Sequence, residues 1–450
     1  MQRSANTRLF GAVMTVGTLT ALVKMGAAGK DVLVAFQFGL GDALDAFLIA
    51  LVLPQFLVNV VSGSLNVALV PSYMSVRDRL GTRAAQSLLS TVVFCSTGLL
   101  IGLSVVLAAT ATHVLPLLAL GFSDDKLRLT THLYYWLLPM LLFSGLSTTW
   151  GAILNTLDRF ALPAIVPLIT SVSTVIAIVA LAGEWAIYAL AGGMVLGMAV
   201  EALILGIALL KAGVWPFPSW HGMTSDLKEV FRQFGPAMMG NLLMGSTALI
   251  GQSMAAMLGP GSVAAFNYGA KITTLLLSVG SIAVSTAILP HFSRMVAACQ
   301  WEAVRHTLTG AIRYIALISV PLMLVLIYFS EPIIRLCFQR GAFTAHDAEL
   351  VGHVQMLFAL QIPFYAISIV AVRLLSALKA NQVTMWGTFI NLFVSVILNY
   401  VLIQWYGVAG LALSVSLMYL VSMTYLLTMA VLSLRGTQST HGVVTQMATN

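Results

Sequence analysis

The sequence predicts an all-α integral membrane protein with about 12 transmembrane helices, arranged as two pseudo-symmetric six-helix halves around a central cavity. Of the 450 residues, 59% are hydrophobic and only 8% are charged, whereas roughly a quarter of an ordinary soluble domain is charged. Apolar runs close to the roughly 20 residues that cross a bilayer recur along the chain. One such run also aligns without a gap with a second run in the other half of the chain.

In lipid, only helices and closed β-barrels satisfy the hydrogen bonds of the backbone. Barrel strands are short segments of alternating hydrophobicity, whereas the apolar runs of this chain are long and continuous, so we predict helices. The basic segment Met1 to Arg8 leads into the first run and lacks a small-residue cleavage site, so we interpret that run as a span and not as a signal peptide. The predicted spans are 9–29, 43–70, 86–110, 131–153, 161–182, 186–210, 235–258, 264–290, 308–329, 351–378, 383–404 and 407–433.

The basic residues give the orientation, because cytoplasmic loops carry an excess of Lys and Arg. With a cytoplasmic N-terminus, the inner side holds Arg77, Arg79, Arg83, Arg159, Lys211, Lys228, Arg232, Arg294, Arg305, Lys379 and Arg435. The outer loops hold chiefly Lys126, Arg128, Arg335 and Arg340. Both termini are therefore predicted to be cytoplasmic, and the net charge of +7 reflects this bias and not nucleic-acid binding.

An internal repeat relates the second span to the eighth. An offset of 219 residues places Ala46 on Ala265, Ser62 on Ser281 and Pro71 on Pro290. Two parallel halves follow, as in many transporters. We predict an N-terminal lobe (1–211), a cytoplasmic linker (212–234), a C-terminal lobe (235–434) and a cytoplasmic tail (435–450).

The linker ends in a segment with the pattern of a capped amphipathic helix, with Ser225 at the N-cap. We expect this helix to lie along the inner membrane surface and to join the two halves. The alternative is a plain solvated linker.

Three lysines within or next to the spans are candidate substrate-binding residues, because a charge that persists in a span usually faces a cavity or a partner. Lys24 and Lys30 belong to the first span and its end, and Lys271 to the eighth. Cations from both halves suit an anionic substrate, and pyrophosphate is the natural candidate. For Lys30 the alternative is that it reaches the outer interface next to Asp31.

Two acidic residues are candidates for gating or ion coupling. Asp45, near the outer end of the second span, can pair with Lys24 or Lys30, either alternating between partners or in a static ion pair. Glu201, in the sixth span, can carry a proton or simply reach the inner interface.

We find no signature of catalysis: the sequence has no P-loop, no GxSxG and no HExxH, so we do not expect an enzyme. The three cysteines are far apart and form no metal motif. We therefore expect no cofactor, and any energy source must be an ion gradient or the membrane potential.

Three passages resemble the MurJ/MviN family of lipid II flippases, within the larger group of polysaccharide and multidrug exporters. The first runs from Gly41-Asp-Ala-Leu-Asp-Ala-Phe through Leu53-Pro54 to Val70-Pro71-Ser72-Tyr73. The second is Phe234-Gly235-Pro236-Ala237. The third, from Glu331 to Asp347, contains the F-x-R-G-x-F pattern as Phe338, Arg340, Gly341 and Phe343.

This resemblance implies a flippase of the bacterial cytoplasmic (inner) membrane that acts in peptidoglycan and cell-wall synthesis. Its substrate would be an undecaprenyl-pyrophosphate-linked saccharide, carried from the inner to the outer leaflet by alternating access, with membrane lipids as further partners and the monomer as the expected state. The family's two first-span basic residues, six apart, correspond to Lys24 and Lys30, its aspartate ahead of Ala-Phe to Asp45, and its eighth-span basic residue to Lys271.

The chain also departs from the family, which usually carries arginine at the lysine positions and an arginine pair where this chain has Val58-Asn59. Lysine lacks the bidentate fork of arginine, so we expect this chain to contact the pyrophosphate headgroup with a different hydrogen-bond geometry from that of the family. The alternatives are a flippase for an exopolysaccharide or O-antigen repeat unit and a cation-coupled small-molecule exporter.

Overall fold

The computed structural model describes residues 2–181, 183 and 185–449, and in this part of the chain the regular structure is helical. The chain divides into two compact units, Met1–Leu249 and Ile250–Asn450. Among the described residues, eight helical segments are long and apolar enough to cross a bilayer, or nine if α4 and α5 form one bent span. The predicted all-α membrane fold is confirmed, and the number twelve stays a prediction.

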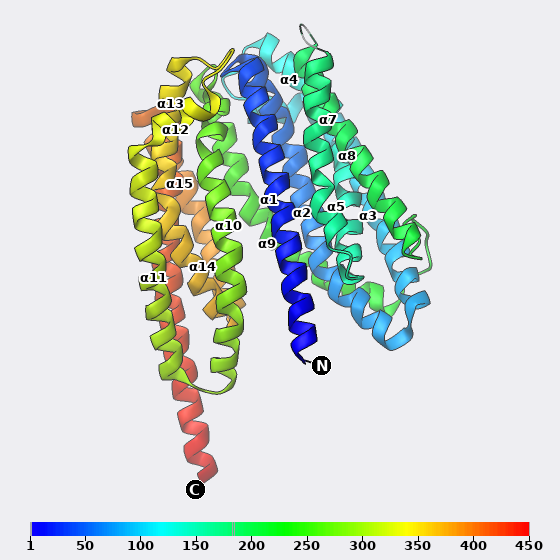
Figure 1. Cartoon of the computed structure of the whole chain (residues 1–450), viewed down its shortest axis with the longest axis vertical. Helices are drawn as coiled ribbons and strands as arrows, with labels where there is room; N and C mark the ends of the chain where they lie inside the picture. Colours follow the sequence, from blue (N-terminus) through cyan, green and yellow to red (C-terminus); the bar gives the residue numbers. More distant parts are fainter. Residues whose placement is uncertain (1, 182, 184, 450) are drawn as a thin grey trace. The chain divides into compact units, whose positions relative to one another are not determined.

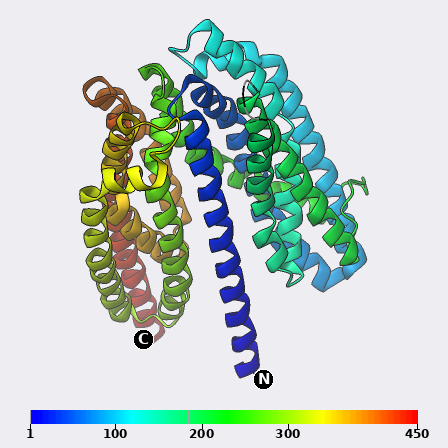
Figure 2. The ribbon, with the colours of Figure 1, turned by 45° about the horizontal axis from the view of Figure 1, so that its top comes forward.

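The first unit begins with α1 (Gln2–Phe38) and α2 (Asp42–Leu80), two long helices joined by a tight turn at Gly39 (Figure 2). It continues with α3 (Thr82–Leu118), α4 (Asp124–Leu137), α5 (Met140–Thr156), α6 (Ala161–Ile165), α7 (Pro167–Ala180) and α8 (Ala186–Lys211). Most of α9 (Ser225–Ala255) follows. Two predicted spans are interrupted, at Pro139 and at Pro167, because proline cannot donate the helical hydrogen bond.

The second unit holds η1 (Ala256–Leu258), α10 (Ser262–Ala297), α11 (Trp301–Tyr328), α12 (Ser330–Phe338), α13 (Ala345–Ala359), α14 (Gln361–Ala377) and α15 (Asn381–Thr449). The last helix bends at Gly407, where φ is 55° and ψ is −132°. Only glycine adopts such a conformation without strain. This bend separates the two predicted spans 383–404 and 407–433.

Small residues set the closest helix pair of the first unit, α7 and α8, which lie side by side (Figure 1). Gly193 and Gly197 of α8 form a GxxxG pattern, and a Cβ at Gly197 would lie 2.5 Å from the Cα of Thr170 on α7. In lipid, where no hydrophobic force drives helices together, close backbone approach of this kind supplies the packing energy.

Each unit has a buried apolar cluster of its own. In the first unit, Tyr73, Leu89, Trp150 and Leu205 belong to one cluster that joins α2, α3, α5 and α8. In the second unit, Phe292, Val304, Leu374 and Leu426 join α10, α11, α14 and α15. Each unit therefore has an apolar core built from several helices.

Candidate functional site

A buried ion cluster joins the first turn of α2 to the first turn of α4. The Nζ of Lys126 lies 2.6 Å from Oδ1 of Asp42 and 2.9 Å from Oδ2 of Asp45. The side chain of Lys126 is 7% exposed and that of Asp45 is fully buried, whereas Asp42 is 59% exposed. Because a buried charge is costly unless it is paired, the cluster fastens α2 to α4.

The local sequence explains why Lys126 reaches this position. The Ser123 hydroxyl caps α4 by accepting a hydrogen bond from the backbone N–H of Lys126 at 3.4 Å. The ring of Phe122 lies 4.1 Å from the ammonium, within the range of a cation–π contact. Both aspartates lie in the first turn of α2, where the helix dipole favours negative charge.

Sequence reasoning missed Lys126 as the partner of Asp45 and assigned it to an outer loop. The two residues lie 81 positions apart, so no helical periodicity links them. A signal was present, because Ser123 followed by two aspartates is the pattern of a helix start. The expected ion pair of Asp45 is therefore observed with a different lysine.

The two lysines of α1 lie in different surroundings. Lys24 is exposed, whereas Lys30 forms an ion pair with its neighbour Asp31 at 3.1 Å. Six residues advance a helix by about 9 Å and one and two-thirds turns, so the two ammonium groups do not share one face. Gly26, between them, packs against the side chain of Leu168 on α7, which holds this part of α1 against the first unit.

Glu201 lies on the seam between α7 and α8, one turn beyond Gly197. Its Oε2 accepts a hydrogen bond from the Thr170 hydroxyl at 3.0 Å, and the residue is half-buried. The spacing Gly193, Gly197, Glu201 puts all three on one stripe of α8. The carboxyl is thus held between two closely packed helices.

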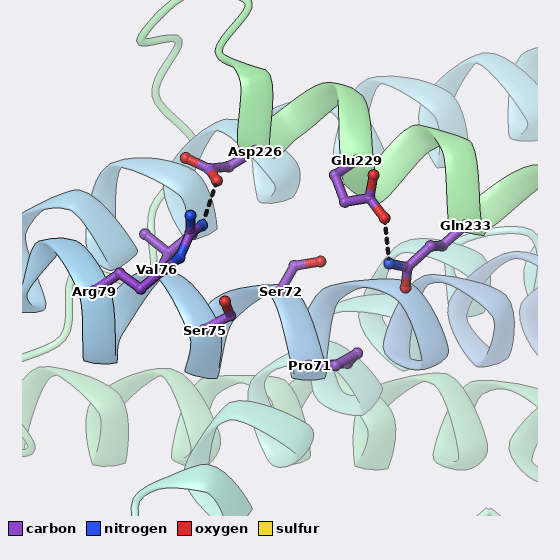
Figure 3. Close-up of a pocket in the computed structure, with 8 residues that line it drawn as sticks. All are labelled: Pro71, Ser72, Ser75, Val76, Arg79, Asp226, Glu229 and Gln233. Carbon is purple, nitrogen blue, oxygen red and sulfur yellow. Dashed lines mark hydrogen bonds and ion pairs between the residues drawn. The ribbon is translucent and has the colours of Figure 1, made fainter.

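A polar groove of about 290 Å³ lies between the last turns of α2 and the start of α9, lined by Pro71, Ser72, Ser75, Val76, Arg79, Asp226, Glu229 and Gln233 (Figure 3). Arg79 donates to Asp226 at 3.0 Å, and Gln233 donates to Glu229 at 2.7 Å. The hydrogen bond from Gln233, followed by that from Arg232, lowers the pKa of the Glu229 carboxyl.

The start of α9 corrects one detail of the predicted linker helix. The side chain that caps it is Thr224, whose Oγ1 accepts from the Leu227 N–H at 3.2 Å, and not Ser225. The helix that begins with the amphipathic segment continues through Pro236 to Ala255. Farther along α9, the Asn241 amide donates to the Ser64 hydroxyl of α2 at 2.9 Å.

In the second unit, Lys271 is an exposed residue of α10. Tyr268, one turn earlier, contacts both aromatic residues of the F-x-R-G-x-F pattern, with ring centroids 5.1 Å from Phe338 and 5.8 Å from Phe343. The turn between them includes Gly341 at φ 58°, which favours glycine. The pattern therefore fastens the segment after α12 onto α10, close along the helix to Lys271.

The position of the family's arginine pair contains no cation. Val58 is buried, and Asn59 accepts a hydrogen bond from the Gln55 amide on the same helix at 3.5 Å. Among the described residues, no group of three His, Cys, Asp or Glu side chains could hold a metal ion. The structure thus brings Asp45 to Lys126 and Glu201 to Thr170, whereas Lys24 and Lys30 lie on one helix and Lys271 lies in the other unit.

Comparison with known proteins gives a family match over most of the chain. A model described as lipid II flippase MurJ matches residues 34–449. The probable lipid II flippase MurJ of Synechocystis sp. is 27% identical over 425 residues, which are 91% of this chain and 79% of that protein. The lipid II flippase MurJ of Burkholderia cenocepacia is 26% identical over 423 residues, or 90% and 81% of the two chains.

Solved structures show a similar fold. A lipid II flippase MurJ in an inward closed conformation superposes with a TM-score of 0.81 at 23% identity, covering 92% of this chain and 87% of that one. An inward-facing multidrug resistance MATE family transporter of the MOP superfamily gives a TM-score of 0.77 at 15% identity, covering 95% and 99%.

Proposed function

This chain belongs to the lipid II flippase MurJ family, and from this membership we propose that it carries an undecaprenyl-pyrophosphate-linked saccharide across the cytoplasmic membrane. The match over residues 34–449 supports this proposal most directly, because it covers both units. The cargo moves from the inner to the outer leaflet as the two halves alternate access to the two sides. The chain acts as a transporter, with its termini in the cytoplasm.

Lys24, Lys30 and Lys271 supply the cations that bind the pyrophosphate. Lys24 and Lys271 are exposed residues of otherwise apolar helices, and a charge that persists in a span usually faces a cavity or a partner. Lys30 already pairs with Asp31, so its contribution requires exchange of that pair. A lysine acts as a compact point charge and not as a bidentate fork, so this site neutralises the pyrophosphate more than it orients it.

Asp45 acts as a gating residue. Its carboxylate is bound to Lys126, and this cluster ties α2 to α4 in the observed state. A gate requires a contact that is stable in one state and exchanged in another. The Lys126–Asp45 pair meets this requirement, because Asp42 can keep the Lys126 ammonium paired when Asp45 leaves. The released Asp45 carboxylate then takes Lys24 or Lys30 as its partner, because a buried charge is costly unless it is paired.

Glu201 serves as the ion-coupling residue. It is a carboxyl on a span, bonded to a neutral hydroxyl and not to a cation, and such a group can take up a proton without breaking an ion pair. A gradient of protons or the membrane potential is the energy source that this arrangement suits. The segment 212–234 joins the two lobes on the cytoplasmic side.

Genetic rescue tests the proposed cargo. In a bacterium depleted of its own lipid II flippase, expression of this chain is expected to restore growth and peptidoglycan synthesis, and the Lys24→Gln/Lys271→Gln double variant is expected to fail. Lack of rescue by a chain that is inserted in the membrane at normal levels would overturn the assignment to the peptidoglycan precursor. Rescue of a strain that lacks an O-antigen flippase, without rescue of the first strain, would identify a different glycan.

A further inference from the structure

The segment before α9, residues 214–224, follows a defined path across α3, and we name it the strap. The backbone N–H of Ser219 donates to the carbonyl of Ser90 at 3.2 Å. The N–H of His221 donates to the hydroxyl of Thr91 at 3.3 Å, and the Trp220 ring lies 5.9 Å from that of Phe94. The strap is therefore held on α3 by backbone and aromatic contacts, and it is not a free linker.

A cavity of about 410 Å³ lies between the strap and the first turns of α3, lined by Arg83, Gln86, Ser87, Ser90, Trp215, Ser219 and His221. Its volume is in the range of small-molecule sites, and its polar side chains include a guanidinium, an amide and hydroxyls. No carboxylate lines it, although carboxylates pair with the neighbouring Arg77 and Arg79. The groove in Figure 3 differs in this respect, because Asp226 and Glu229 line it.

This composition selects an anion with several oxygen acceptors. Arginine presents a fork of N–H donors that matches phosphate geometry, and the hydroxyls and the amide can donate to further oxygens. A zwitterionic headgroup is a poorer fit, because the cavity offers no carboxylate to its ammonium. The lining of the cavity therefore fits a phosphate group without an attached cation.

The surface next to the cavity suits an acyl chain. Arg83, Ser87 and Ser90 line the cavity, and the same stripe of α3 continues at helical spacing with Phe94, Ile101 and Val105. These three apolar side chains are exposed, and Val105 is 62% exposed. From Ser90 to Phe94 the helix rises only about 6 Å, so a polar pocket passes directly into an apolar face.

Aromatic residues place this transition at a membrane interface. Trp215, Phe217 and Trp220 of the strap are each about half exposed. Aromatic rings of this kind collect at the level of lipid headgroups. The positions of the basic residues assign these helix ends to the cytoplasmic side, where the leaflet carries anionic lipids.

We propose that the cavity under the strap is a binding site for the phosphodiester headgroup of an anionic phospholipid, with Arg83 as its main ligand and the exposed stripe of α3 as the acyl-chain surface. The resident lipid anchors the strap, and with it the start of α9, to the membrane. This lipid is distinct from the transported substrate, and the proposal does not depend on the identity of that substrate.

Lipid titration of the purified, delipidated full chain tests the proposal by native mass spectrometry. Dioleoylphosphatidylglycerol is expected to bind more tightly than dioleoylphosphatidylcholine. Replacing Arg83 with Gln removes a charge-assisted contact of roughly 1.5 kcal/mol or more, so the affinity for the anionic lipid is expected to fall about tenfold. The matched control is Arg232→Gln, an exposed arginine on the same side that lines neither cavity, and it is expected to change nothing.

Equal affinity of wild type and Arg83→Gln for phosphatidylglycerol, or equal binding of the two lipids, overturns the proposal. Displacement of the lipid by millimolar inorganic phosphate would identify a site for free phosphate. Displacement by undecaprenyl pyrophosphate would identify a substrate site. Either result also overturns the proposal. If Arg83→Gln does not fold, hydrogen exchange of the wild type decides. Phosphatidylglycerol is expected to slow amide exchange in residues 214–224 relative to phosphatidylcholine, and identical rates contradict the site.

Discussion

The ammonium of Lys126 lies 2.9 Å from the carboxylate of Asp45, and both side chains are buried between the first turns of α2 and α4. The pair is buried more deeply than the ion pairs Lys30–Asp31, Arg79–Asp226 and Arg335–Glu331. Burial makes it sensitive to the loss of either partner, because the charge that remains has no water to solvate it.

Replacement of Lys126 by Gln is expected to destabilise the protein by about 3–5 kcal/mol and to abolish transport, because it removes the buried ammonium that Asp42 and Asp45 share. The midpoint of thermal unfolding in detergent measures the first effect and a flipping assay in proteoliposomes the second. Arg128→Gln, an exposed change on the same helix, is the control and is expected to leave both values unchanged.

The double variant Asp45→Lys/Lys126→Asp, which exchanges the two charges, separates the contribution of the ion pair to stability from that of side-chain packing. It restores an attractive pair at the same place, so it is expected to recover part of the stability that either single change removes. A double variant as unstable as the single ones would show that the pair is not an energetic unit.

The double change Lys24→Gln/Lys271→Gln is expected to abolish lipid flipping while the protein remains inserted, because the pyrophosphate loses two counter-charges. Lys24→Arg keeps the charge and is expected to keep activity. A matched control is Arg313→Gln, an exposed basic residue of α11 that is not among the candidate site residues. Full activity of the double variant in a proteoliposome assay would remove both lysines from the site.

Gly197→Ala is expected to destabilise the first unit by about 1–3 kcal/mol, because the added Cβ meets backbone of α7 that cannot move away. The same change should displace Thr170 from Glu201, one turn away. Gly98→Ala on α3 is the control, because nothing lies within 4 Å of a Cβ there. Thermal unfolding of the two variants gives the comparison, and equal midpoints would rule out close α7–α8 packing.

The Glu229 carboxyl is expected to titrate below its ordinary pKa of 4.5, because Gln233 and Arg232 donate to its charged form. A pKa that is lowered on folding adds stability above the unfolded value, and this stability is lost as the pH falls through the folded value. The site is therefore fully formed at neutral pH. Side-chain NMR titration should show a higher midpoint in Gln233→Ala and a smaller rise in Arg232→Gln, and unchanged midpoints would contradict the assigned bonds.

Several candidate site residues can be named from the sequence because their signal is local. Lys24, Lys271 and Glu201 are ionisable residues within apolar runs, and the cost of burying charge in lipid makes them candidates, so their roles stay predictions. Lys126 and Thr170 have no such local signal. Lys126 becomes the partner of Asp45, and Thr170 that of Glu201, only when two helices pack together. The sequence likewise predicts only a linker at the strap, because its hydrogen bonds to Ser90 and Thr91 join segments about 130 residues apart.

The sequence by itself determined the membrane class, the helical fold and the family. Composition, the length of the apolar runs and the family motifs are present in the linear sequence and do not depend on which helices pack together. Only the tertiary structure decided that Asp45 pairs with Lys126, that Thr170 holds Glu201, and that the strap covers a cavity on α3. The reason is physical: within a bilayer, charges and polar groups take the partners that neighbouring helices bring to them, and helix packing alone decides which helices are neighbours.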